Sequence, residues 1–168
     1  MNVAFFLTPK NQVVWVPASA TLGQAILRMR PHGYTAIPIL DDGGGYVGTL
    51  TEGDILWHLV NAPGISLRAA ELNPLLAVER RTNNLPVHID ADIEALITRA
   101  VDQNFVPVLD DSDVFIGIVT RKPIIEHCAR RAGILLGIKR AEASADIGLN
   151  LDPFNHFQFR SSRIEPPE

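Results

Sequence analysis

The sequence Gly48-Thr49-Leu50-Thr51-Glu52-Gly53-Asp54-Ile55 decides the fold, because it recurs 69 residues later as Gly117-Ile118-Val119-Thr120-Arg121-Lys122-Pro123-Ile124. Each copy follows a proline, two apolar residues and an Asp-Asp pair, beginning at Pro38 and at Pro107. A match held at one offset over about 20 residues indicates a duplicated module. Small duplicated modules usually pair with their twins, so we expect any binding site to lie between the two copies.

The composition is that of an ordinary globular chain and narrows the function classes. The 168 residues are 46% hydrophobic and 20% charged, with a net charge of −4. This is enough chain to bury a sizeable core. Proteins that bind nucleic-acid backbones tend to be basic, so the negative charge argues against a nucleic-acid partner. The single cysteine, Cys128, allows no disulfide within the chain, which is simplest to reconcile with a cytoplasmic location.

The sequence lacks the patterns of membrane, metal and catalytic sites. No apolar run approaches the ~18–20 residues that span a membrane. The apolar N-terminus has no basic start and is cut short at Pro9-Lys10, so we expect no signal peptide. The histidines have no metal-ligand spacing, and neither a nucleophile elbow nor a phosphate-binding P-loop is present. We therefore expect no metal, no membrane partner and no enzymatic activity.

Hydrophobic periodicity predicts the order β-α-β-β-α in each copy. In the first copy we expect strands at 13–16, 34–40 and 46–50, with helices beginning at Thr21 and Thr51. In the second copy we expect strands at 85–89, 104–109 and 114–119, with helices beginning at Asp92 and Thr120. Alternating strands and helices indicate an α/β fold, an α+β sandwich in which each repeat is one small sheet covered by two helices.

These elements divide the chain into four parts. Residues 8–62 are the first repeat, 63–82 a connector, 83–131 the second repeat, and 132–168 a C-terminal extension of unknown role. The basic pair Arg80-Arg81 in the connector is expected to be solvated on the surface.

The two helix starts differ in charge. Thr51-x-x-Asp54 follows a strand, and a helix N-terminus presents free N–H groups that suit an anion, while the Asp54 carboxylate suits a ribose diol. The same residues are also ordinary helix-capping residues. In the second copy, Arg121 and Lys122 stand at a helix start, where the helix dipole disfavours cations. Either an anionic ligand offsets that cost or the two side chains simply face solvent.

The two units resemble a tandem pair of CBS domains, the Bateman module of regulatory proteins. The resemblance rests on Gly-Tyr-Thr-Ala-Ile-Pro (33–38) and G-x-x-T-x-x-D (48–54), then on Phe-Val-Pro-Val (105–108) and Gly-x-x-Thr-Arg-Lys (117–122), and it covers Val13 to Arg131. It implies that the repeats pair through their sheets about a pseudo-twofold axis. It also implies adenosyl ligands in two clefts between the repeats, and a homodimer of two modules.

Carried over by motif, each cleft takes the strand of one repeat and the helix start of the other. The first cleft would be formed by Tyr34, Thr35, Ala36, Pro38, Thr120, Arg121 and Lys122. The second would be formed by Asn104, Phe105, Val106, Pro107, Thr51 and Asp54. Pro123 stands where the family usually has aspartate, and a proline cannot bind a ribose diol. In this respect the chain is similar to stand-alone CBS proteins of Gram-positive bacteria that bind cyclic di-AMP.

The resemblance therefore implies a non-catalytic, nucleotide-sensing module. Its regulatory ligand, in place of any cofactor, would be an adenine nucleotide, with cyclic di-AMP ahead of AMP, ADP and ATP. A protein partner that the sequence does not name would read the bound state. The alternative is a structural dimerisation module whose clefts hold no ligand.

Overall fold

A computed structural model describes residues 2–61, 67–82 and 84–133. The chain divides into two compact units, Met1–Cys128 and Ala129–Glu168, and every strand described lies in the first. The predicted C-terminal extension falls almost wholly outside the described residues, and its role stays a prediction.

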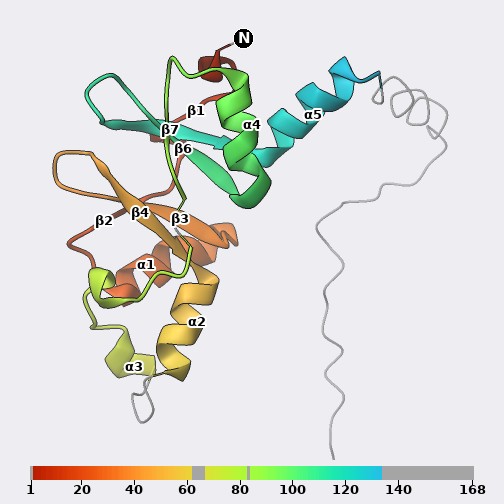
Figure 1. Cartoon of the computed structure of the whole chain (residues 1–168). Helices are drawn as coiled ribbons and strands as arrows, with labels where there is room; N and C mark the ends of the chain where they lie inside the picture. Colours follow the sequence, from red (N-terminus) through yellow and green to blue (C-terminus); the bar gives the residue numbers. More distant parts are fainter. Residues whose placement is uncertain (1, 62–66, 83, 134–168) are drawn as a thin grey trace, which may run out of the picture. The chain divides into compact units, whose positions relative to one another are not determined.

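Repeat 1 is a three-stranded sheet with two helices (Figure 1). Its strands, in the order β2-β3-β4, are β2 (Val16–Pro17), β3 (Ala36–Leu40) and β4 (Tyr46–Thr51). Its helices are α1 (Leu22–Met29), which a 3₁₀ turn continues over Arg30–His32, and α2 (Glu52–Val60). The connector holds a short helix α3 (Leu67–Ala70) and a 3₁₀ turn η4 (Leu75–Ala77).

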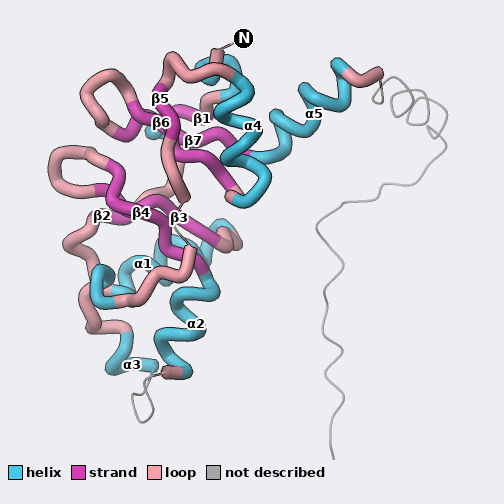
Figure 2. Tube along the Cα trace, viewed as in Figure 1, coloured by secondary structure: helices cyan, strands magenta, loops and turns pink. Residues whose placement is uncertain are grey.

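Repeat 2 has the same order of elements and one additional edge strand. Its sheet has the order β1-β7-β6-β5, formed by β1 (Thr8–Pro9), β5 (Val87–His88), β6 (Phe105–Leu109) and β7 (Phe115–Thr120). Its helices are α4 (Ile93–Asp102) and α5 (Arg121–Arg131). The strands of both repeats lie at the centre of Figure 2, with α1, α2 and α4 outside them. The predicted α/β fold with two β-α-β-β-α repeats is confirmed.

The duplication persists in the register of the sheets. The hairpin β3–β4 pairs Ala36 with Thr51, and the hairpin β6–β7 pairs Phe105 with Thr120, so both ladders begin at equivalent residues. Each ladder has its bulge at the same step. An isolated bridge joins Gly45 to Val114, which are equivalent positions of the two repeats. Equivalent residues can pair with each other only near a twofold axis, so the pseudo-twofold axis passes between the two hairpin turns.

Local side-chain chemistry explains where the helices begin. The Thr21 side chain accepts a hydrogen bond from the Gln24 backbone N–H at 3.3 Å, and the Gln24 side chain accepts one from the Thr21 N–H at 3.0 Å. Asp92 accepts a hydrogen bond from the Ala95 N–H at 2.8 Å. These contacts satisfy N–H groups that a helix N-terminus otherwise leaves unpaired. The predicted helix starts at Thr21 and Asp92 are confirmed.

The two sheets meet in a small apolar cluster of their own, separate from the core of each repeat. Its buried members are Leu40, Leu109 and Phe115. The rings of Tyr46 and Phe115 stack at a centroid distance of 6.2 Å, and the Phe115 N–H donates to the Gly44 carbonyl at 3.0 Å. The Tyr46 hydroxyl lies 2.7 Å from Thr49 Oγ1 and donates to the Asn84 carbonyl at 2.9 Å. Burial raises the pKa of Tyr46 to about 12, so the phenol keeps its proton at neutral pH.

The N-terminal residues depart from the sequence prediction. The strand predicted at 13–16 begins only at Val16, as β2. It is preceded by β1, which pairs antiparallel with β7 of the other repeat. Val3 and Phe6 are buried in the core of repeat 2. The start of the chain thus completes the second repeat, and residues 10–15 lead from one sheet to the other.

The equivalent glycines Gly48 and Gly117 give a matched test of this N-terminal strand, because both have φ 158°. A Cβ on Gly117 would collide with the backbone carbonyl oxygen of Thr8, whereas a Cβ on Gly48 would meet the movable guanidinium of Arg80. We expect Gly117→Ala to lower the free energy of unfolding by about 1–3 kcal/mol, as overpacking does, and Gly48→Ala to lower it less. Urea unfolding measures both losses. If both variants lose the same free energy of unfolding, the close approach of β1 to Gly117 adds nothing to the cost of the shared backbone conformation.

Candidate ligand-binding site

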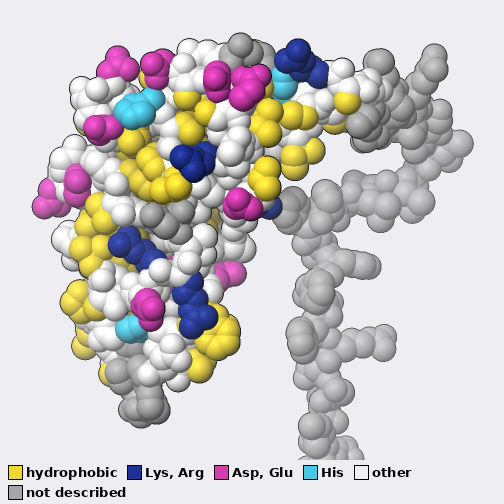
Figure 3. All heavy atoms as spheres, viewed as in Figure 1, with side chains coloured by type: hydrophobic (Ala, Val, Ile, Leu, Met, Phe, Trp, Pro, Cys, Tyr) yellow, Lys and Arg dark blue, Asp and Glu magenta, His cyan; other side chains and the backbone are white. Residues whose placement is uncertain are grey.

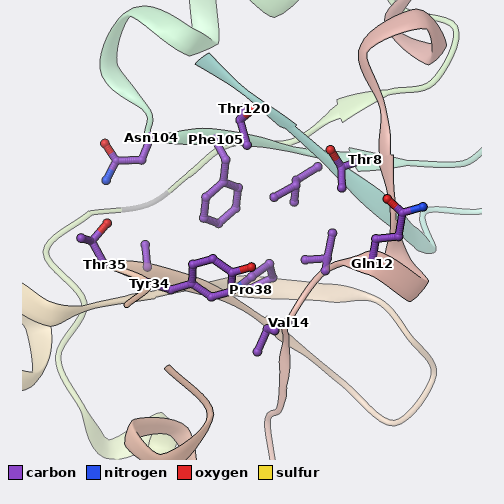
Figure 4. A pocket seen from close by; sticks show the side chains of 12 residues that line it. Thr8, Gln12, Val14, Tyr34, Thr35, Pro38, Asn104, Phe105 and Thr120 are labelled. Atoms are coloured by element: carbon purple, nitrogen blue, oxygen red, sulfur yellow. The ribbon is translucent and has the colours of Figure 1, made fainter. Parts of the chain in front are cut away.

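A cavity of about 270 Å³ lies between the two repeats. Three parts of the chain line it: the N-terminal segment, the start of β3 and the strands β6 and β7 of repeat 2 (Figure 4). The lining residues are Thr8, Gln12, Val13, Val14, Tyr34, Thr35, Ala36, Pro38, Asn104, Phe105, Ile118 and Thr120. Equivalent positions of the repeats meet here, since Thr35 and Ala36 correspond to Asn104 and Phe105 at the 69-residue offset.

Aromatic rings border the middle of the cavity. Figure 4 shows Phe105 and Tyr34 on opposite sides of it. Phe105 is buried in β6, whereas Tyr34 is 40% exposed and stacks on the His32 ring at 5.1 Å. A planar ligand inserted here would contact apolar side chains on both sides, which is how small-molecule pockets bury most of a ligand.

None of the described residues that line the cavity has a charged side chain. Figure 4 shows Thr35 and Asn104 at one end and Thr8 and Gln12 at the other, with Thr120 and mostly apolar or aromatic side chains between them. Such a cavity suits a flat, neutral group with hydrogen-bonding edges, such as a purine base. The described lining residues offer no cation to a phosphate that is joined to such a base through a ribose.

For the first predicted cleft, the structure brings together five of the seven predicted residues. These are Tyr34, Thr35, Ala36, Pro38 and Thr120. The two cations, Arg121 and Lys122, are not part of the lining.

Arg121 has a structural contact that the sequence did not indicate. Its Nε donates to the Gln103 carbonyl at 2.7 Å, and its Nη2 donates to the Val101 carbonyl at 3.0 Å. Both carbonyls belong to the C-terminal end of α4, where a cation is favourable. The neighbouring helix end therefore offsets the cost of placing Arg121 at the start of α5. Lys122, in contrast, is exposed.

The residues predicted for the second cleft have different surroundings in the described part of the chain. Asn104 and Phe105 line the first cavity instead, and Val106 and Pro107 are buried in β6. Asp54 is 1% exposed and caps α2: its Oδ2 accepts from the Thr51 N–H at 2.9 Å and from the Thr51 hydroxyl at 2.7 Å.

The connector takes the remaining oxygen of Asp54. The Arg81 backbone N–H donates to Asp54 Oδ1 at 2.9 Å, and the Arg81 guanidinium lies 4.8 Å from the centre of the Trp57 ring. Arg80 donates to the Val47 carbonyl at 3.3 Å. The basic pair expected to be merely solvated thus binds the connector to repeat 1. A ribose could reach Asp54 only after the Arg81 contact opens, so ribose binding by Asp54 stays a prediction.

Sequence reasoning missed five lining residues. They are Thr8, Gln12, Val13, Val14 and Ile118. Four of them precede β2 and lie outside the motif from which the cleft residues were carried over. The apolar run at 3–7 and the strand predicted at 13–16 indicated burial without showing which repeat would cover these residues.

Comparison with known proteins finds a family match for repeat 1. Residues 6–61 match the family model described as "CBS domain". Repeat 1 is therefore similar to a CBS domain, and repeat 2 has the same strand register.

The chain is also similar to several bacterial proteins. It is 27% identical over 127 residues to Cyclic di-AMP receptor B of Bacillus subtilis, covering 75% of this chain and 85% of the relative. A CBS domain protein of Streptococcus pneumoniae TIGR4 is 25% identical, with a TM-score of 0.68 over 77% of this chain and 87% of that one. Listeria monocytogenes CbpB in complex with c-di-AMP is 24% identical, with a TM-score of 0.67 over 79% and 98% of the two chains, and shows the shared fold.

The described residues contain no helix that is both long and apolar enough to cross a membrane. Nor do they bring three or more histidine, cysteine or acidic side chains together as metal ligands. On the face drawn in Figure 3, basic and acidic side chains are interspersed, without the continuous basic stripe typical of nucleic-acid binding.

We expect Asp54→Ala to act on stability, because the carboxylate is buried and holds both the α2 cap and the connector. The free energy of unfolding should fall by about 1–3 kcal/mol, the cost of leaving buried hydrogen-bonding groups unpaired. Thr21→Ala, which removes the more exposed cap of α1, should cost about 1 kcal/mol. Urea unfolding and calorimetric titration with cyclic di-AMP together check the assignment. If Asp54→Ala keeps its stability but loses affinity for cyclic di-AMP, the carboxylate binds the ligand.

Proposed function

We propose that this protein is a cytoplasmic, non-catalytic module that senses an adenine nucleotide, with cyclic di-AMP ahead of AMP, ADP and ATP. The observation that carries the proposal is the uncharged, aromatic-walled cavity where equivalent strand starts of the two repeats meet. Similarity to Cyclic di-AMP receptor B supports the ligand class. The absence of charge in the lining supports a buried base with its phosphates outside.

Lys122 is the residue proposed to meet those phosphates. It is exposed, and it follows the lining residue Thr120 by two positions at the start of α5. An ammonium group and a phosphate form a charge-assisted hydrogen bond, which is stronger than a neutral one. Arg121 donates its hydrogen bonds to the end of α4. We propose that it supports the site and does not itself bind the phosphates.

We further propose one ligand for each chain. The second cleft would need Asp54, whose oxygens are occupied by Thr51 and by the Arg81 backbone. The first cavity needs no such rearrangement. A nucleotide bound there would contact both repeats and the N-terminal segment, and so would stabilise their arrangement by mass action.

A homodimer is proposed on the face of α1 and α2. A groove of about 530 Å³ on this face is lined largely by apolar side chains, among them Ile26, Met29, Ile55 and Leu59. Leu56 also lines the groove and is 54% exposed. Most homo-oligomers close through a twofold axis, so the same face of a second copy would cover these side chains. If the cavity holds no ligand, this contact leaves a structural dimerisation module as the alternative function.

Calorimetric titration of the purified chain with cyclic di-AMP and with AMP tests the proposed function. We expect one cyclic di-AMP for each chain, bound at least as tightly as AMP. Lys122→Ala should weaken cyclic di-AMP binding by about 1.5 kcal/mol, the lower end for a hydrogen bond to a charged group. This loss should shrink as salt screens the exposed ammonium.

Arg121→Ala provides the contrasting variant. It should lower the unfolding free energy, because two carbonyls at the end of α4 lose their donor, while Lys122→Ala should leave unfolding unchanged. If the wild-type protein binds no adenine nucleotide, the structural module becomes the better description.

Light scattering tests the proposed dimer. At micromolar concentration we expect twice the 18.4 kDa mass of the chain. Leu56→Asp should give monomers, because it places a charge in the apolar contact. Leu76→Asp is a matched control, since Leu76 is 52% exposed but lies in the connector turn η4 rather than on α1 or α2. A monomeric wild-type protein would rule the dimer out.

A further inference from the structure

The N-terminal wall of the cavity is held at both ends. Before it, β1 pairs with β7, where Thr8 lies opposite Ile118. After it, β2 pairs with β3, where Val16 lies opposite Ile39. The residues between these strands pass from the sheet of repeat 2 to that of repeat 1, so their backbone is fixed by both repeats.

Contacts inside this segment restrict it further. The Val13 N–H donates to the Lys10 carbonyl at 3.1 Å and closes the 3₁₀ turn η2 (Lys10–Gln12). The Lys10 ammonium lies 5.4 Å from the centre of the Trp15 ring. Gln12 ends this turn and lines the cavity at the end opposite Asn104 (Figure 4).

The carboxamide of Gln12 has no hydrogen-bond partner among the described residues, and the side chain is exposed. The two buried amide side chains nearby behave differently. Asn84 donates to the Phe105 carbonyl at 3.1 Å, and Gln103 exchanges hydrogen bonds with the backbone of Leu85 at 2.8 and 3.1 Å. Those amides join the residues before β5 to the start of β6 within repeat 2, whereas the amide of Gln12 is available at the cavity.

A carboxamide carries a donor and an acceptor side by side. Adenine presents the complementary pair, an exocyclic N–H donor next to a ring-nitrogen acceptor, and Gln is one of the side chains that match it with two hydrogen bonds. The lining residues Val13 and Ile118 are apolar and supply contact area, and Thr8 adds a hydroxyl group at the same end of the cavity as Gln12.

We propose that Gln12 is the base-reading residue of this site, and that its carboxamide forms paired hydrogen bonds with one adenine of the ligand. The inference rests on the proposed nucleotide function and adds to it the residue that recognises the base. It assigns a recognition role to a segment that precedes the duplicated motif.

Three variants test the proposal by calorimetric titration with cyclic di-AMP. Gln12→Met keeps the length of the side chain and removes its donor and acceptor. Gln12→Ala removes the side chain altogether. Asn11→Ala is the matched control, because Asn11 is an exposed amide in the same turn that does not line the cavity. We expect Gln12→Met and Gln12→Ala to weaken binding about 5- to 100-fold, the range for a paired contact to a base.

The control should bind within twofold of wild type, and all three variants should keep the wild-type unfolding midpoint. If Gln12→Met binds cyclic di-AMP within twofold of the wild-type affinity, Gln12 does not read the base. The proposed function would still stand in that case. A wild-type protein that binds neither cyclic di-AMP nor AMP would overturn both together.

Discussion

The contact between the two sheets around Phe115 is the interaction on which the site depends. Phe115 is 1% exposed and stacks on Tyr46, the residue at the equivalent position of the other repeat. A few residues away, the equivalent Gly45 and Val114 pair through their backbones. Neither of the two small sheets can bury its inner face alone, so the two must pack on each other. This packing sets the spacing between β3 and β6, and with it the cavity.

The two halves are nearly symmetric in backbone, but they are covered by different segments. Gly48 lies under the Arg80 side chain of the connector, and Gly117 lies under the backbone of Thr8 in β1. The connector also occupies Asp54, whose equivalent in repeat 2 is Pro123. The connector thereby covers the carboxylate of one potential cleft, while the N-terminal segment forms a wall of the other. The symmetry of the duplication creates two positions for a ligand, and the non-repeated segments distinguish them.

Arg121 shows how a charge pattern can have two physical causes. A cation at a helix start is unfavourable within its own helix, which made an anionic ligand a reasonable explanation. The guanidinium instead donates to carbonyls at the end of α4, where the partial negative charge of another helix is concentrated. The guanidinium interacts unfavourably with the dipole of its own helix, α5, and favourably with the dipole of α4. Only the folded chain brings the two helix ends together.

The sequence by itself determined the duplication, the order of the elements and the helix caps at Thr21 and Asp92. The caps depend on local hydrogen bonds and the duplication on a repeat at fixed offset. Both kinds of pattern can be recognised in one amino-acid sequence. It also named most of the residues that line the cavity on the β3 and β6 side, because they lie in the duplicated motif. The tertiary structure alone decided that the N-terminal strand joins repeat 2, that Gln12 reaches the cavity and that Asp54 is covered. The reason is that a two-residue strand and a backbone N–H from the connector make contacts between residues far apart in sequence, and no local pattern specifies their partners.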